Sequence, residues 1–161
     1  MNKLLCKPCF AFEALASLVF CNYCRKDIPE VAEWVKNTYK GITIGPSNRF
    51  FNILINHHSL AEIESFNIDR LIQIYPQYIH EDAYTNQFAD AITSGLHLLK
   101  ESHFEKIWSN TLLSIVEKQC ENFLSACNSE KVSNILMDIE KVHGKPITDD
   151  IIIYMTFFTS P

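Results

Sequence analysis

Glycine and long apolar runs are both scarce in this sequence. Only four of the 161 residues are glycine and six are proline, which excludes collagen-like and low-complexity chains and favours helices. The longest apolar stretch, Phe10 to Cys24, contains Glu13 and is shorter than the roughly 18 to 20 residues of a membrane-spanning helix. We therefore expect no membrane insertion. The start of the chain lacks a clear cleavage site, so we interpret residues 1–9 as an N-terminal extension of the mature chain.

Sequence motifs typical of enzymes are missing as well. There is no glycine-rich phosphate loop, nucleophile elbow or kinase signature, and the Gly144-Lys145 pair is followed by proline. The six histidines contain no His-Glu-x-x-His pair. We therefore expect a protein that is not an enzyme.

The remaining composition is that of one folded domain. Apolar residues make up 47% and charged residues 20%, as in globular proteins. A chain of this length buries about two thirds of its unfolded surface, so its stability requires no cofactor. We predict a single helical domain over residues 1–161.

Apolar residues recur at helical spacing in four pairs of segments. The first segments are anchored at Leu15, Ile53, Ile92 and Ile135, which are 38, 39 and 43 positions apart, and the second segments centre on Trp34, Leu71, Trp108 and Ile152. Because a pair of short helices cannot bury its apolar face alone, such pairs stack on one another. We predict an all-α fold of about eight helices in four antiparallel pairs, arranged as a small irregular α-solenoid or a helical bundle.

Local signals place several helix boundaries. The apolar spacing predicts helices at about 10–25 and 103–126, and Ser59 with Glu62 has the spacing of a capping box. The helix that follows is expected to weaken near Phe66 and to end before Pro76, and residues 76–84 are expected to form a loop. Asn128 or Ser129 is expected to cap a helix that ends at Gly144.

The last apolar segment, residues 151–158, is ambiguous between strand and helix. Its isoleucines favour a strand, but the sequence offers no evident second strand to pair with it. We therefore predict a helix here. A helix that is apolar on all sides must be covered by its neighbours or by another molecule, so we expect a protein partner to contact Ile152, Tyr154, Phe157 and Phe158.

Two cysteine pairs have the spacing of zinc ligands. Cys6-x-x-Cys9 and Cys21-x-x-Cys24 together supply four thiolates, enough for a tetrahedral structural site. The residues between the pairs form an apolar helical run, where cysteine behaves as a small buried hydrophobe. We favour that second interpretation and no cofactor, with zinc as the alternative. Six cysteines without a secretory signal indicate a reducing, intracellular compartment, either cytoplasm or organelle.

The basic residues are concentrated near the start of the chain. Residues 1–49 hold seven Lys or Arg against four acidic residues, whereas the remainder holds seven against fifteen, for a net charge of −5. Aromatic residues lie beside Lys36, Lys40 and Arg49, a pattern that serves base stacking and phosphate contact on RNA. RNA binding through these three residues is therefore an alternative hypothesis. The competing interpretation is an ordinary solvated surface.

A third hypothesis is a globin-like ligand-binding sensor. His97 precedes a long predicted helix, as a haem-binding histidine does in globins, and about eight helices is also the globin count. Pro146 interrupts the region where a globin would have its long last helix.

The helical period resembles that of HEAT, armadillo and octotricopeptide repeats. Residues 132–146, VSNILMDIEKVHGKP, are similar in layout to the repeat units of organellar RNA-binding proteins of the octotricopeptide kind. The resemblance covers residues 12–158 and implies an α-solenoid that holds a partner along one face, often within a ribonucleoprotein or another assembly. It carries over no contact residue, because no diagnostic motif is matched. The leading hypothesis is therefore a non-catalytic scaffold or adaptor subunit that binds protein partners.

Overall fold

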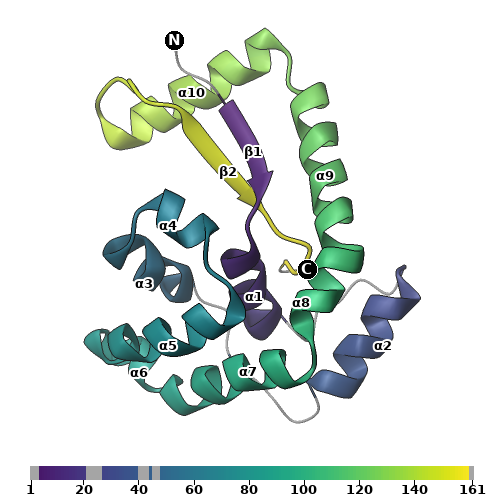
Figure 1. Cartoon of the computed structure of the whole chain (residues 1–161). Coiled ribbons are helices and arrows are strands. Elements are labelled where there is room, and N and C mark those ends of the chain that lie inside the picture. Colours follow the sequence, from purple (N-terminus) through teal and green to yellow (C-terminus); the bar gives the residue numbers. More distant parts are fainter. Residues whose placement is uncertain (1–3, 21–26, 40–43, 45–47, 160–161) are drawn as a thin grey trace.

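Helices make up most of this chain, as predicted. The structure is a computed structural model and describes residues 4–20, 27–39, 44 and 48–159. Its helices α1 to α8 gather into a body, from which α9, α10 and a small sheet project (Figure 1). The elements are β1 Leu4–Pro8, α1 Phe10–Val19, α2 Pro29–Thr38, α3 Arg49–His57, α4 Leu60–Glu64, α5 Ile68–Tyr78, a 3₁₀ turn Ile79–Glu81, α6 Ala83–Asn86, α7 Ala89–Glu101, α8 Phe104–Ile107, a π-helical turn Trp108–Leu112, α9 Leu113–Ala126, α10 Ser129–His143 and β2 Ile151–Met155.

Helix α1 is the centre of the core. Every residue from Ala11 to Val19 is buried, because helices α3, α4, α5 and α7 all pack against it. The predicted helix at 10–25 is confirmed for its first ten residues, and the part from 21 onward lies outside the described residues. The buried hydroxyl of Ser17 donates to the carbonyl of Ala14 and accepts from the hydroxyl of Tyr39, so its burial leaves no polar group without a partner.

Gly95 allows α7 to approach α1 closely. A Cβ atom on Gly95 would lie only 2.8 Å from the Cδ2 atom of Leu18, which is shorter than real carbon contacts allow. On the other side of the body, the indole of Trp34 in α2 donates to the carbonyl of Ser102 after α7. These two contacts fix α7 between α1 and α2.

The two ends of the chain meet in a parallel two-stranded sheet. Strand β1 pairs with β2 so that Leu4 lies opposite Ile151 and Pro8 opposite Met155. The predicted helix at 151–158 is therefore wrong, and so is the all-α description. The isoleucines keep their strand preference because residues 4–8, which we had assigned to an extension, supply the missing partner. The expected fourth helical pair is instead a helix, α10, followed by a strand.

Most helix boundaries between residues 59 and 144 follow local capping. Ser59 and Glu62 form the expected capping box, the chain breaks between α4 and α5, and Asn67 caps α5. One boundary was wrong: α5 continues through Pro76 to Tyr78. A proline near the end of a helix disrupts only the last turn. The residues expected to form a loop at 76–84 instead complete α5 and begin α6 through a 3₁₀ turn.

Candidate functional site

Helix α10 carries an apolar stripe that the rest of the chain leaves partly exposed. We define the stripe by its five side chains, which recur at helical spacing: Val132, Ile135, Leu136, Ile139 and Val142. None of them belongs to the buried core or to the side chains that pack directly against it. The side chain of Val142 is 85% exposed. Most apolar stripes on helices face a core, whereas four of the five side chains here are only partly buried and the fifth, Val142, is exposed.

Local interactions at both ends of α10 stabilise the helix, although its stripe is not fully buried. The side chain of Asn128 accepts a hydrogen bond from the backbone N–H of Lys131 at 2.8 Å, which is an N-cap. Gly144 ends the helix in the left-handed conformation, with φ of 71°, as predicted. Beyond it, the carboxylate of Glu140 accepts the N–H of Ile147 and ties the connection to β2 back onto α10.

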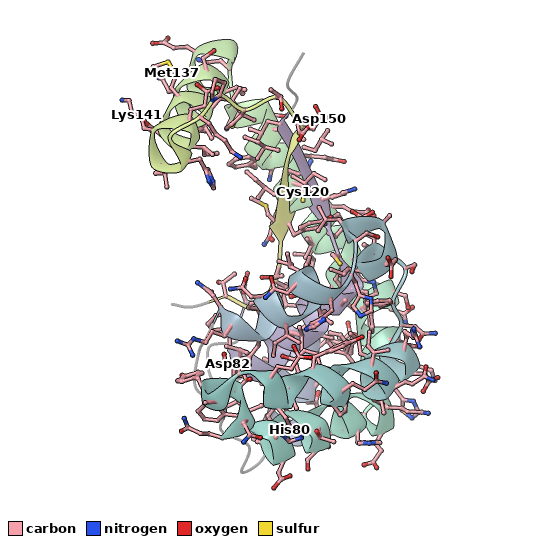
Figure 2. All side chains as sticks on the ribbon, turned by 90° about the vertical axis from the view of Figure 1, so that its left-hand side faces the viewer. His80, Asp82, Cys120, Met137, Lys141 and Asp150 are labelled. Atoms are coloured by element: carbon pink, nitrogen blue, oxygen red, sulfur yellow. The ribbon has the colours of Figure 1, made fainter. Side chains whose placement is uncertain are left out.

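The stripe borders a shallow apolar hollow between α9 and α10. Its lining includes Phe123, Ala126 and Cys127 from the end of α9 and Ile135 from α10, and its volume is about 430 Å³. Leu124, next to Phe123, is also exposed. The two helices therefore share an apolar surface, and Figure 2 shows α10 at the tip of the projection.

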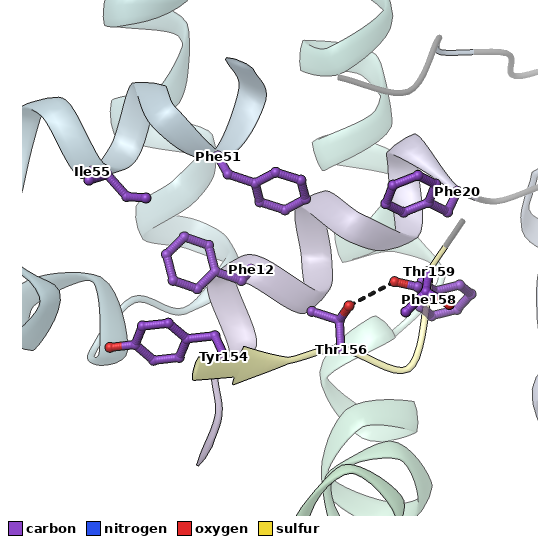
Figure 3. A pocket seen from close by; sticks show the side chains of 8 residues that line it. All are labelled: Phe12, Phe20, Phe51, Ile55, Tyr154, Thr156, Phe158 and Thr159. Atoms are coloured by element: carbon purple, nitrogen blue, oxygen red, sulfur yellow. Dashed lines mark hydrogen bonds between the residues drawn. The ribbon is translucent and has the colours of Figure 1, made fainter. Parts of the chain in front are cut away.

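A second apolar concavity, which we call the aromatic pocket, lies at the base of the projection (Figure 3). Its volume is about 430 Å³. Helices α1 and α3 form one side, and β2 with the segment after it forms the other. The lining residues are Phe12, Phe20, Phe51, Ile55, Tyr154, Thr156, Phe158 and Thr159.

The polar groups around the aromatic pocket are already engaged within the chain. The hydroxyl of Tyr154 donates to the carboxylate of Glu64 at 2.7 Å, and the ammonium of Lys7 contacts the same carboxylate at 2.5 Å. Burial and the hydrogen bond to Glu64 raise the pKa of Tyr154, and the contact with Lys7 lowers the pKa of Glu64. Tyr154 therefore keeps its proton at neutral pH. Such a pocket suits an apolar side chain or ligand.

The residues that we expected a partner to contact are divided between surface and core. Ile152 and Tyr154 are partly exposed in β2. Phe157 and Phe158 are 3% and 1% exposed and pack in the chain's own core. The local sequence pattern does not reveal this burial, because the group that accepts hydrogen bonds from the backbone of this segment lies on a distant helix.

That acceptor is the carboxylate of Glu13 on α1. It accepts the N–H of Phe157 at 2.6 Å and the N–H of Phe158 at 3.3 Å. Burial raises the pKa of Glu13 to about 8, against the opposing effect of these two hydrogen bonds. Raised carboxyl pKa values are common in active sites, but Glu13 is fully buried and both of its oxygens bond to the backbone of the chain itself. Its role is to hold the end of the chain.

The structure describes two of the four cysteines of the zinc hypothesis, Cys6 and Cys9. Cys6 lies on β1 near Cys120 of α9, whereas Cys9 is buried at the start of α1. Cys21 and Cys24 lie outside the described residues. Within the described part of the chain, no three metal-binding side chains are grouped so that they could hold an ion.

Two of the three basic residues of the RNA hypothesis, Lys36 and Arg49, lie on separate helices. Lys36 is exposed on α2, and Arg49 begins α3 on the other side of α1 (Figure 1). The guanidinium of Arg49 lies 3.1 Å from the carboxylate of Asp82 and 4.9 Å from the ring of Tyr84. Lys40 lies outside the described residues.

The globin-like hypothesis finds no support at its histidine. His97 is exposed on the surface of α7, whereas a haem-binding histidine faces an enclosed apolar pocket.

Comparisons with known proteins assign no family to this chain. No family model, curated protein or solved structure matches it. Over the residues that the structure describes, none of the helices combines the length and the apolar character needed to cross a membrane. The exposed apolar surfaces described above are therefore the basis for a functional hypothesis.

Proposed function

We propose that this protein is a non-catalytic scaffold or adaptor subunit that binds a protein partner through the apolar stripe of α10. The observation that carries the proposal is the exposure of the stripe, which has no buried member and ends in Val142 at 85% exposure. Full burial of one Val, Leu or Ile side chain contributes about 1.5 to 3 kcal/mol. All five side chains of the stripe are still partly exposed, so their burial by a partner would contribute several kcal/mol to the free energy of binding.

The partner's contact surface is an apolar helix face. A helix of fifteen residues such as α10 presents ridges of side chains at spacings of three and four, and these fit the grooves of another helix. The hollow between α9 and α10 continues the stripe along one side. The aromatic pocket offers a second place for an apolar anchor side chain of the same partner.

Cross-linking of the native assembly tests this proposal. Lys131 and Lys141 are exposed on α10 and serve as attachment points for an amine-reactive cross-linker. The full chain, isolated from its natural source, is expected to co-purify with one partner at fixed stoichiometry and to form cross-links from these two lysines. A monodisperse monomer that turns over a substrate would overturn the proposal.

A further inference from the structure

Strand β2 has one paired edge and one open edge. Residues Ile151–Met155 pair with β1 on one side, and among the described residues no strand pairs with the other side. Figure 2 looks toward that open side: β2 lies in front of β1, and no helix passes in front of it. The edge of a strand presents backbone N–H and C=O groups that a further strand can bond.

The sequence of β2 contains no residue of the kinds that protect a strand edge from pairing. Its sequence is three isoleucines followed by tyrosine and methionine, with high strand preference and no charge or proline. Natural proteins protect open edges with lysine, proline, bulges or a covering element. An unprotected edge of this kind is typical of a strand that pairs with another chain.

The opposite edge of the sheet is covered. Helix α9 packs mainly against β1 and lies beside it on the side away from β2 (Figure 1). A further strand can therefore join the sheet at β2 but not at β1.

We propose that β2 pairs in antiparallel orientation with β2 of a second copy of this chain. The result is a four-stranded sheet in the order β1, β2, β2, β1, with the covered β1 strands at both outer edges. Pairing of one surface with itself is the usual interface of a two-fold symmetric dimer. Because both open edges are used, the assembly closes at two copies and does not extend into a fibre.

Charge favours the antiparallel orientation of the second copy. Asp149 and Asp150 immediately precede β2. Parallel pairing would place these aspartates beside those of the other copy, and like charges on neighbouring strands destabilise a sheet. Antiparallel pairing places them at the opposite end of the other copy's strand, beyond Met155 and away from its aspartates. This surface is separate from the stripe of α10, so the dimer does not depend on the proposed function.

Sedimentation of the purified full chain over a range of concentrations tests the proposal. The expected result is a reversible species of twice the chain mass. Ile152→Lys adds a charge to the open strand and is expected to weaken dimerisation roughly tenfold or more. The matched control is Leu5→Lys, because Leu5 lies opposite Ile152 in the register but on the covered strand. This variant is expected to leave dimerisation unchanged.

Hydrogen exchange gives a second measurement that does not depend on any variant. The amides of residues 151–155 are expected to exchange more slowly as the protein concentration rises, while those of α7 do not change. A monomer at all concentrations, open-ended polymers, or equal weakening by both lysine variants while circular dichroism shows intact folds would each overturn the proposal.

Discussion

Glu13 on α1 accepts the backbone N–H of Phe157 at 2.6 Å, across 144 positions of sequence. This contact fixes the end of the chain against its central helix. With the pairing of β1 and β2 beside it, it closes the body of the protein and defines the base from which α9 and α10 project.

Replacement of Glu13 by alanine is expected to release the segment after β2. The change leaves the N–H groups of Phe157 and Phe158 without their acceptor and opens a cavity, so we expect the free energy of unfolding to fall by about 3 kcal/mol. Chymotrypsin is expected to cleave at these two phenylalanines before the rest of the chain unfolds. Glu117→Ala, an exposed position on α9, is the control. An equal effect of both changes would contradict this assignment.

The stability of the protein is expected to depend on pH through Glu13. Its pKa is raised from 4.5 to about 8 in the folded protein, so the folded state binds this proton more tightly than the unfolded chain. The free energy of unfolding therefore falls as pH rises from about 4.5 to about 8, by at most about 1.4 kcal/mol per pH unit. Urea unfolding at several pH values measures the slope. Glu13→Gln is expected to flatten it, and parallel profiles for both proteins would rule the effect out.

Cys6 is expected to react slowly with alkylating reagents. Burial and the neighbouring thiol of Cys120 raise the pKa of Cys6 to about 12, and only the thiolate is a nucleophile. At pH 8 the folded protein should label at Cys6 roughly a thousandfold more slowly than the unfolded chain. Mass spectrometry of peptides after timed treatment with iodoacetamide measures the rate. Fast labelling of Cys6 in protein that stays folded would argue against the contact with Cys120.

Gly144 is expected to tolerate asparagine better than alanine. Its φ of 71° is left-handed, and a Cβ added there would meet no atom within 4 Å, so the cost of a side chain is conformational only. Gly144→Ala is expected to destabilise the end of α10 by about 1 kcal/mol, and Gly144→Asn by clearly less. Amide exchange near His143 reports the difference. Equal exchange in both variants would count against a helix end of this kind.

Local chemistry was sufficient to predict the helices of the middle of the chain. The capping box at Ser59, the cap at Asn128 and the stop at Gly144 each act within a few residues, and a sequence displays such interactions directly. One long apolar stripe likewise predicts a continuous helical segment, which in the structure consists of α8, the π-helical turn and α9.

Contacts between distant segments were not predictable from local patterns. Residues 4–8 contain no β-branched side chain, so nothing marked them as the partner strand of Ile151–Met155. Glu13 looked like an interruption of an apolar run, although it accepts hydrogen bonds from the other end of the chain. The exposure of the α10 stripe could not be predicted for the same reason. Apolar spacing predicts that a helix has an apolar face, but not which other segment covers that face.

The central claim is that a partner protein covers the stripe of α10. Two variants of the same kind test it most directly, because Val142 lies on the stripe and Met137, 51% exposed, lies on the opposite face of the helix. Each variant is purified from the native source, and the measurement is the amount of partner protein that co-purifies with it at fixed stoichiometry. We predict that Val142→Glu lowers it at least tenfold while Met137→Glu leaves it unchanged. Equal retention by the two variants would contradict the account.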